Sequence, residues 1–190
     1  MIDKINQLKN KIENKSAEEV LQIASQEFGS RIVFASSLGE EDQVITDMVA
    51  RLAPGIEIFT LDTGRLPQET YDLIAQTQKR YPQLKFKIYF PDYKKIEEMV
   101  ASKGINLFYE SVENRKLCCG LRKVEPLGRA LANADSWITG LRRDQSVTRA
   151  DLDVVEWDEG NKKIKINPLL DWSLEDVHRY IKEHKVDVNP

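Results

Sequence analysis

The spacing of apolar residues divides the chain into segments of two kinds. Residues 32–35 form a short, continuously apolar run, which is typical of a strand that is covered on both faces of a parallel sheet. Residues 56–61 predict a second strand, and the alternating residues 85–90 predict a third. Three more strands are expected at 136–140, 152–157 and 163–166, and apolar spacings of three and four residues predict helices at 17–28, 40–52, 67–79, 93–103 and 173–184.

The order of these segments indicates the fold class. Strands that alternate with helices of ten or more residues predict an α/β fold with a mainly parallel sheet sandwiched by helices, a Rossmann-like arrangement. The chain has 190 residues and contains no internal repeat, low-complexity tract or linker-like stretch. Residues 1–190 are therefore expected to form a single domain. A helix is also expected around the two cysteines, and only residues 106–114 stay unassigned.

Composition excludes several classes of protein. Hydrophobic residues make up 41% of the chain and charged residues 31%, and no apolar run approaches the ~20 residues of a membrane span. The net charge of −3 gives no global basic field for nucleic acid. The polar start Met1–Lys4 does not resemble a secretion leader, and two cysteines are typical of a reducing compartment. We therefore expect a cytoplasmic protein with no membrane or nucleic-acid partner.

The two cysteines, Cys118 and Cys119, are adjacent in the sequence. Adjacent cysteines rarely form a disulfide with each other, because the small ring strains the bond. The pair could therefore bind a metal, react as thiols, or be buried without a special role. Lys123 follows Cys119 by four residues, so in a helix its ammonium would share a face with that thiol and lower the thiol pKa. An iron–sulfur cluster usually takes four thiolates, and this chain supplies two.

Polar clusters follow three of the predicted strands. They are residues 36–42, 62–65 and 140–145, and the carboxyl ends of parallel strands are where ligands bind in open sheets. Hydroxyls and backbone N–H groups at a helix start form an anion cradle, and the guanidinium groups of Arg142 and Arg143 suit phosphate or sulfate. Each cluster alone is typical of a helix cap or a solvated loop, but the three together favour nucleotide-like anion binding.

One feature of the first cluster opposes this interpretation. Glu40, Glu41 and Asp42 place negative charge where the phosphate would sit. The sequence also has no Walker pattern, so the predicted site binds its anion without a glycine-rich phosphate loop.

As a set, the motifs resemble those of the phosphosulfate reductases of sulfate assimilation, which are the adenylyl-sulfate and phosphoadenylyl-sulfate reductases. The resemblance runs from about Ile32 to the end of the chain and implies a fold like that of the adenine nucleotide alpha-hydrolases. It is carried by Ser36-Ser37 to Asp42, Leu61-Asp62-Thr63-Gly64, Arg122-Lys123-Val124-Glu125-Pro126-Leu127, Gly140-Leu141-Arg142-Arg143-Asp144-Gln145-Ser146 with Arg149, and Asn167-Pro168-Leu169-Leu170-Asp171-Trp172.

The resemblance also implies which residues contact the substrate. The residues near the phosphate or ribose would be Ser36, Ser37, Gly39 and Asp42. Those nearer the adenine would be Leu61, Asp62 and Gly140. The residues that face the phosphosulfate would be Lys123, Arg142, Arg143 and Arg149.

The adjacent cysteines are similar to those of the iron–sulfur branch of the family, which mostly takes adenylyl sulfate. The resemblance implies that Cys118 and Cys119 are two of the four ligands of a 4Fe-4S cluster. In this family a cysteine thiolate on a C-terminal tail attacks the sulfur, AMP leaves, and thioredoxin releases sulfite from the thiosulfonate. The expected activity is therefore reduction of adenylyl sulfate for cysteine biosynthesis, with thioredoxin as partner and adenylyl sulfate or AMP as ligand.

The end of the chain departs from the family pattern. The family continues beyond Val188-Asn189-Pro190 with a Cys-x-x-Cys pair and then with the tail that carries the nucleophile. We therefore expect no catalytic nucleophile in this chain, and we expect that the chain by itself does not reduce adenylyl sulfate. Alternatives are a phosphoadenylyl-sulfate reductase, a non-redox ATP pyrophosphatase-type protein, and a regulatory nucleotide-binding protein. The sequence leaves the electron donor and the oligomeric state open, a homo-oligomer included.

Overall fold

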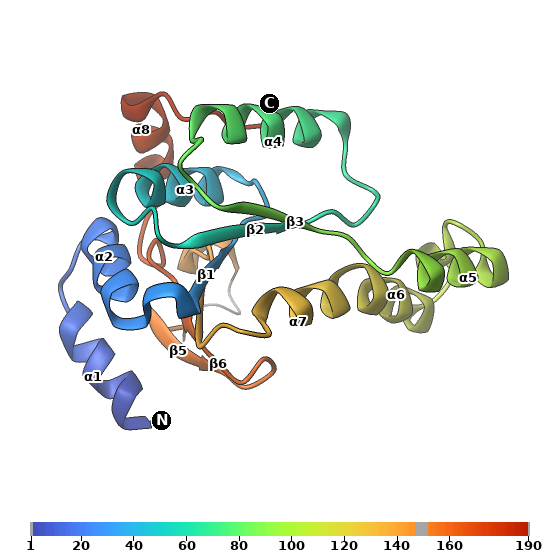
Figure 1. Cartoon of the computed structure of the whole chain (residues 1–190), viewed down its shortest axis with the longest axis horizontal. Helices are drawn as coiled ribbons and strands as arrows, with labels where there is room; N and C mark the ends of the chain where they lie inside the picture. Colours follow the sequence, from blue (N-terminus) through green and yellow to red (C-terminus); the bar gives the residue numbers. More distant parts are fainter. Residues whose placement is uncertain (1, 147–151, 190) are drawn as a thin grey trace.

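A sheet of six strands forms the centre of the computed structural model, which describes residues 2–146 and 152–189 (Figure 1). The strands lie in the order β3-β2-β1-β4-β6-β5, and every neighbouring pair is parallel except β5 with β6. This confirms the predicted α/β fold with a mainly parallel sheet. The strands span Ile32–Ala35 (β1), Glu57–Leu61 (β2), Phe86–Tyr89 (β3), Ser136–Ile138 (β4), Val155–Asp158 (β5) and Lys163–Ile166 (β6).

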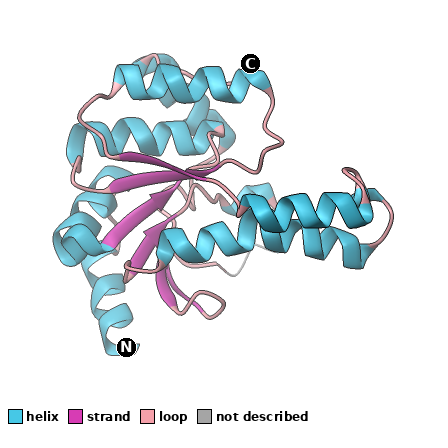
Figure 2. Cartoon of the chain, turned by 45° about the vertical axis from the view of Figure 1, so that its right-hand side comes forward, coloured by secondary structure: helices cyan, strands magenta, loops and turns pink. Residues whose placement is uncertain are grey.

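Helices cover both faces of the sheet. Helices α2, α3, α4 and α8 pack on one face and α7 on the other, while α5 and α6 project from the body as an arm (Figure 2). Among the described residues, no helix has the length and apolar character needed to cross a membrane. The α-helices span Ile2–Ile12 (α1), Ala17–Phe28 (α2), Glu40–Leu52 (α3), Gln68–Arg80 (α4), Tyr93–Lys103 (α5), Val112–Cys119 (α6), Glu125–Leu131 (α7) and Leu174–His184 (α8).

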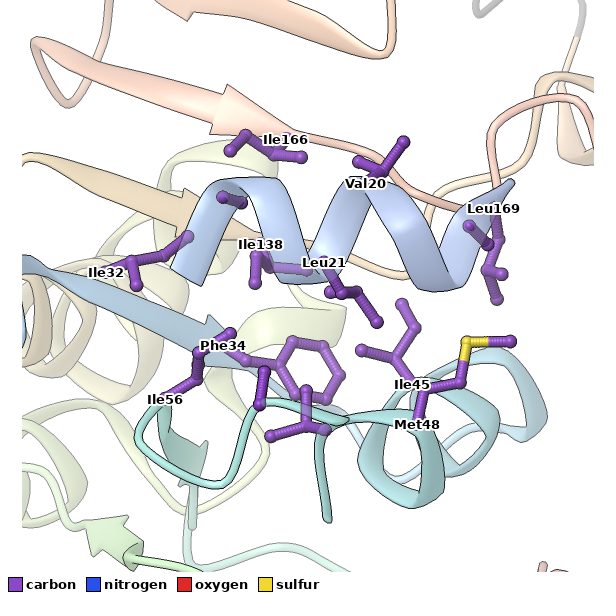
Figure 3. Close-up of a cluster of buried hydrophobic side chains, with 14 of the residues drawn as sticks. Val20, Leu21, Ile32, Phe34, Ile45, Met48, Ile56, Ile138, Ile166 and Leu169 are labelled. Atoms are coloured by element: carbon purple, nitrogen blue, oxygen red, sulfur yellow. The ribbon is translucent and has the colours of Figure 1, made fainter. Parts of the chain in front are cut away.

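The central strand β1 has apolar side chains on both faces, because successive residues of a strand point in opposite directions. Ile32 and Phe34 enter the larger core, where Leu21 of α2 and Ile45 of α3 also lie (Figure 3). Val33 points to the opposite face and packs in the smaller cluster beneath α7. A strand that is buried on both faces needs a continuous apolar run, which is why residues 32–35 are recognisable in the sequence.

Most predicted boundaries agree with the structure to within three residues. Ser16 and Ser173 are the N-caps of α2 and α8 and both form capping boxes, as their spacing from the following acidic residues predicts. The unassigned segment contains a short 3₁₀ turn, Leu107–Tyr109, and the start of α6. Strand β5 begins three residues later than predicted, at Val155, and the Leu152 carbonyl accepts a hydrogen bond from Arg143 instead.

A buried carboxylate joins three of the helices on the larger core. Asp47 of α3 accepts hydrogen bonds of 2.8 Å from the hydroxyls of Tyr81, which follows α4, and Tyr180 of α8. Arg51 donates to the same carboxylate over 3.0 Å. Burial and the neighbouring Asp47 raise the pKa of both tyrosines, so both remain donors at any physiological pH.

We expect Asp47→Ala to lower the free energy of unfolding by about 3 kcal/mol, because it leaves two buried hydroxyls without their acceptor. Urea titration followed by circular dichroism measures this change. The control is Asp135→Ala, which removes an exposed ion pair with Arg31 and should cost less than about 1 kcal/mol. Equal effects of the two substitutions would contradict the role of Asp47.

Candidate functional site

The strand order reverses at β1, and this reversal determines where a ligand can bind. The chain places β2 and β3 on one side of β1 and then returns to place β4 on the other side. The segments that follow β1 and β4 therefore diverge at the carboxyl edge of the sheet, which is the usual ligand site of such folds. The three polar clusters predicted from the sequence all follow strands at this edge.

A cavity of about 430 Å³ lies at this edge, between the sheet and the helical turns that follow Cys119. Its apolar lining includes Phe59, Leu61, Leu66, Leu127 and Trp137. Its polar lining consists of Ser36, Ser37, Thr60, Thr63 and Lys123. An apolar cavity with a few hydroxyls and one ammonium has the chemistry to hold a nucleoside attached to an anion.

The structure brings together some of the predicted substrate-binding residues and not others. Ser36, Ser37, Leu61 and Lys123 all line the cavity. Among the described residues, six others of that set do not line it, and Arg149 lies outside the described residues. The six are Gly39, Asp42, Asp62, Gly140, Arg142 and Arg143, and their contacts with a substrate stay predictions.

Leu38 holds the turn after β1 in place. Its backbone has φ 65°, a left-handed conformation that is uncommon for a branched side chain. The side chain is 1% exposed and packs with Leu73 and Ile74 of α4, and this burial offsets the backbone strain. The strained leucine therefore fixes the position of Ser37, which precedes it at the wall of the cavity.

Each of the three carboxylates at the start of α3 is bonded to another protein group. Glu40 lies 3.0 Å from Nε2 of His178 on α8. Glu41 accepts hydrogen bonds from Arg142 (2.8 Å) and Gln145 (2.9 Å). Asp42 accepts hydrogen bonds from the backbone N–H and the hydroxyl of Ser37. None of these three residues lines the cavity, and Arg142 compensates the charge of Glu41.

Asp42 is buried beneath the turn after β1. Burial raises the pKa of its carboxyl to about 6, although the Ser37 hydroxyl and backbone N–H lower it by donating hydrogen bonds of 2.6 Å to Oδ2. The negative charge of Glu41 adds to the upward shift, and the backbone N–H of Gly140 opposes it. The carboxylate therefore contacts both segments that border the crevice.

Two of the predicted anion-binding arginines are bonded to protein groups in this structure. Arg142 is 6% exposed and forms an ion pair with Glu41. Burial raises the pKa of Glu41, but the hydrogen bond and charge of Arg142, together with other hydrogen bonds to the carboxylate, outweigh this and the net pKa is lowered. Arg143 donates to Asp171 and to the Leu152 carbonyl. An anion that recruits either guanidinium has to compete with these contacts.

Asp62 shapes the turn after β2. Its Oδ1 accepts hydrogen bonds from the backbone of Gly64 (2.7 Å) and from the hydroxyl of Tyr71 (3.0 Å). Gly64 has φ 69°, which a glycine adopts without cost. Asp62 therefore supports the turn that carries Thr63, a residue of the cavity wall.

The two cysteines end helix α6 in different environments. Cys118 is buried against Met99 and Leu107 in the arm, whereas Cys119 is exposed. A π-helical turn, Gly120–Val124, follows directly and brings Lys123 to the cavity. Such turns are rare and occur frequently at functional sites. Within the described part of the chain, no group of three or more His, Cys, Asp or Glu side chains could hold a metal ion.

Arg122 does not line the cavity but supports its wall, and the sequence did not predict this role. It is 8% exposed and donates to the Thr63 carbonyl over 2.6 Å, and its Nε has no partner among the described residues. The only signal in the sequence is that Arg122 precedes Lys123 in a motif shared with the family. The burial of Arg122 depends on the π-helical turn, which apolar spacing does not predict.

Comparisons with known proteins identify relatives of the chain. Residues 31–190 match the family described as the phosphoadenosine phosphosulfate reductase domain. The adenosine 5'-phosphosulfate reductase of Allochromatium vinosum is 48% identical over 92% of this chain. That of Neisseria meningitidis serogroup B is 49% identical over 82% of this chain. The chain spans 68% and 63% of the lengths of these two relatives.

Solved structures are similar across nearly the whole chain. The phosphoadenylyl-sulfate reductase of Candida auris, solved as a phosphate complex, is 31% identical and has a TM-score of 0.83, covering 97% of this chain and 87% of its own. The NH3-dependent NAD synthetase of Campylobacter jejuni is 11% identical, with a TM-score of 0.59 over 96% of this chain and 74% of its own. The second likeness shows the fold alone and confirms its adenine nucleotide alpha-hydrolase-like class.

We expect Gly140→Ala to destabilise the protein by about 1–3 kcal/mol. A methyl group at this position would overlap Oδ1 of Asp42 and lie 3.2 Å from Cβ of Glu41. Thermal unfolding measures the change. Gly128→Ala is the matched control, because a methyl group there meets nothing within 4 Å and alanine favours helix α7. Gly128→Ala should stabilise the protein slightly. A Gly140→Ala protein as stable as this control would contradict the close packing of Gly140 against Asp42 and Glu41.

Proposed function

Because this chain belongs to the phosphoadenosine phosphosulfate reductase domain family, we propose that it binds adenylyl sulfate and that its protein reduces this substrate to sulfite and AMP in sulfate assimilation. The observation that carries the proposal is the cavity in which Ser36, Ser37 and Lys123 lie beside an apolar wall. Two relatives at 48% and 49% identity that are named adenosine 5'-phosphosulfate reductase support this substrate. The small number of cysteines favours a cytoplasmic location.

The lining of the cavity suggests how the substrate lies in it. The adenine would pack against Phe59, Leu61 and Trp137, where burial of an aromatic base is favourable. The ammonium of Lys123 would face the phosphosulfate, and the hydroxyl of Ser36 would donate to a ribose or phosphate oxygen. The hydroxyl of Ser37 already donates to Asp42, so its oxygen would accept from a ribose hydroxyl. Positive charge at this position stabilises the leaving phosphate as negative charge develops on it.

The chemistry expected of the family is a nucleophilic displacement at sulfur. A thiolate attacks the sulfate sulfur, a sulfur–sulfur bond forms, and the sulfur–oxygen bond to AMP breaks with its electron pair going to the phosphate. A dithiol such as that of thioredoxin then reduces the thiosulfonate to sulfite and is itself oxidised to a disulfide. Neither Cys118 nor Cys119 would be the attacking thiol, because both would be ligands of an iron–sulfur cluster.

Cys118 and Cys119 fit one half of a four-thiolate cluster site. Two adjacent thiols end one helix, and Arg122 and Lys123 add positive charge in the next turn, which favours thiolates. We propose that these cysteines hold two irons of a 4Fe-4S cluster, which would supply electrostatic stabilisation beside the cavity. Two further ligands are needed that the described residues do not supply.

A second candidate substrate is phosphoadenylyl sulfate. The structural likeness to the Candida auris phosphoadenylyl-sulfate reductase favours it, since that likeness covers 97% of this chain. The two substrates differ by a 3'-phosphate, which adds two negative charges at most. Comparing the affinities of the protein for the two nucleotides shows which one is the substrate.

We expect calorimetric titration under anaerobic conditions to show tighter binding of adenylyl sulfate than of phosphoadenylyl sulfate, by about tenfold or more. AMP should also bind, and ATP with magnesium should bind weakly. A preference for ATP with magnesium would contradict the proposal, and so would a folded sample that binds none of these nucleotides. Tighter binding of phosphoadenylyl sulfate would transfer the proposal to the second candidate.

The ammonium of Lys123 should be worth about 1.5–3 kcal/mol to the binding of the anion. We therefore expect Lys123→Ala to weaken binding of adenylyl sulfate by about tenfold to a hundredfold while adenosine binding changes less than about twofold. Lys116→Ala removes an exposed ammonium of α6 and is the matched control for net charge. An equal loss for adenosine and adenylyl sulfate would exclude a specific contact with the anion.

A further inference from the structure

One buried carboxylate joins the two segments that border the crevice. Oδ2 of Asp42 accepts two hydrogen bonds of 2.6 Å from Ser37, one from its backbone N–H and one from its hydroxyl. On its other side, the Asp42 carboxyl approaches Gly140 so closely that a methyl group there would overlap Oδ1. The backbone N–H of Gly140 also bonds to the carboxyl. Asp42 thus connects the segment after β1 to the segment after β4.

This arrangement requires the carboxyl of Asp42 to accept hydrogen bonds from both segments. Backbone N–H groups of Ser37 and Gly140 both donate to the carboxyl, and neither can turn into an acceptor. The first turn of α3 keeps the aspartate in place, because the hydroxyl of Thr46 donates to the Asp42 carbonyl over 2.7 Å. The ionised carboxylate accepts from all of these donors, whereas protonation adds a hydrogen to an oxygen that donors already surround.

Asp42 does not line the cavity, but the residue that it holds does. Ser37 lies at the wall of the cavity beside Leu38, whose strained backbone leaves the turn few alternative conformations. On the basis of the function proposed above, we propose that Asp42 is a positioning residue that locks the turn after β1 to Gly140, so that nucleotide binds well only while the carboxylate is ionised. This role differs from the direct contact with phosphate or ribose that the family resemblance implied.

The groups around Asp42 predict the pH range of the effect. Burial raises the pKa of Asp42 to about 6, and Glu41 on the same helix adds to the shift. Arg142, from the segment after β4, pairs with Glu41, and Glu40 pairs with His178 of α8. With a pKa of about 6, about one tenth of the molecules keep an ionised Asp42 at pH 5, so binding should weaken about tenfold between pH 7.5 and pH 5.

The same pKa has the opposite effect on stability. A carboxyl whose pKa is raised in the folded state binds its proton more readily there than in the unfolded chain. Its contribution to stability therefore increases as the pH falls from 7 through 6 toward the unfolded value of about 3.9. Protonation of Asp42 therefore does not unfold the protein at pH 5, and weaker binding at that pH has to come from a change in the site.

The test is a titration of the chain with adenylyl sulfate from pH 5 to pH 8, because neither acid group of this ligand changes charge in that range. We expect Asp42→Asn to bind at least tenfold more weakly at pH 7.5 and to lose the dependence on pH, since the amide turns an NH₂ group toward a backbone N–H. The control Glu40→Gln removes a carboxylate from the same helical turn and should keep both the wild-type affinity and its pH profile.

Four results would overturn the role of Asp42 or the proposed function on which it rests. An Asp42→Asn protein with affinity within twofold of wild type, or with the wild-type pH profile, would overturn the role of Asp42 alone. A folded wild-type chain that binds no adenylyl sulfate at pH 7.5 would overturn the proposed function and this inference together. If Asp42→Asn does not fold, Ser37→Ala replaces it: loss of the donated hydrogen bond should move the binding midpoint to higher pH, and an unchanged midpoint would contradict the proposal.

Discussion

Burial of β1 on both faces is the constraint on which the rest of this structure depends. Its four residues pair in parallel with β2 and β4, and helices close over either side. Parallel pairing brings the ends of the three strands to one edge, so the segments after them become neighbours although they are far apart in the sequence. The cavity with Ser37 and Lys123 at its wall exists because this edge is the place where the strand order reverses.

Charge at this edge is compensated in pairs before any ligand is present. Glu41 with Arg142, and Arg143 with Asp171, leave the acidic run and the arginines tied to each other and not directed at the cavity. Lys123 of the π-helical turn lines the cavity, and Arg122 of the same turn donates to the carbonyl of Thr63 in the cavity wall. This turn therefore links the cavity to the helix that ends in the two cysteines, and it is the physical connection between nucleotide binding and a cluster in the proposed function.

The fold could be predicted almost completely from the sequence, and the site only in part. The run at 32–35 and the spacing from Ser16 to Glu19 have local physical causes, which are burial on both faces and satisfaction of free N–H groups at a helix start. Family membership also followed from motifs that are continuous in the sequence. The family resemblance placed Leu61 and Lys123 in one site, and both line the same cavity.

Tertiary structure decided which of the polar residues face a ligand. The run from Glu40 to Asp42 suggests repulsion of an anion when it is considered alone, and only the positions of His178, Arg142 and Ser37 show that each carboxylate has a partner. The sequence by itself determined the elements, their order and the family, because these depend on local propensity and burial. Hydrogen bonds between residues such as Glu41 and Arg142, about a hundred positions apart, depend on distances that exist only after the chain has folded.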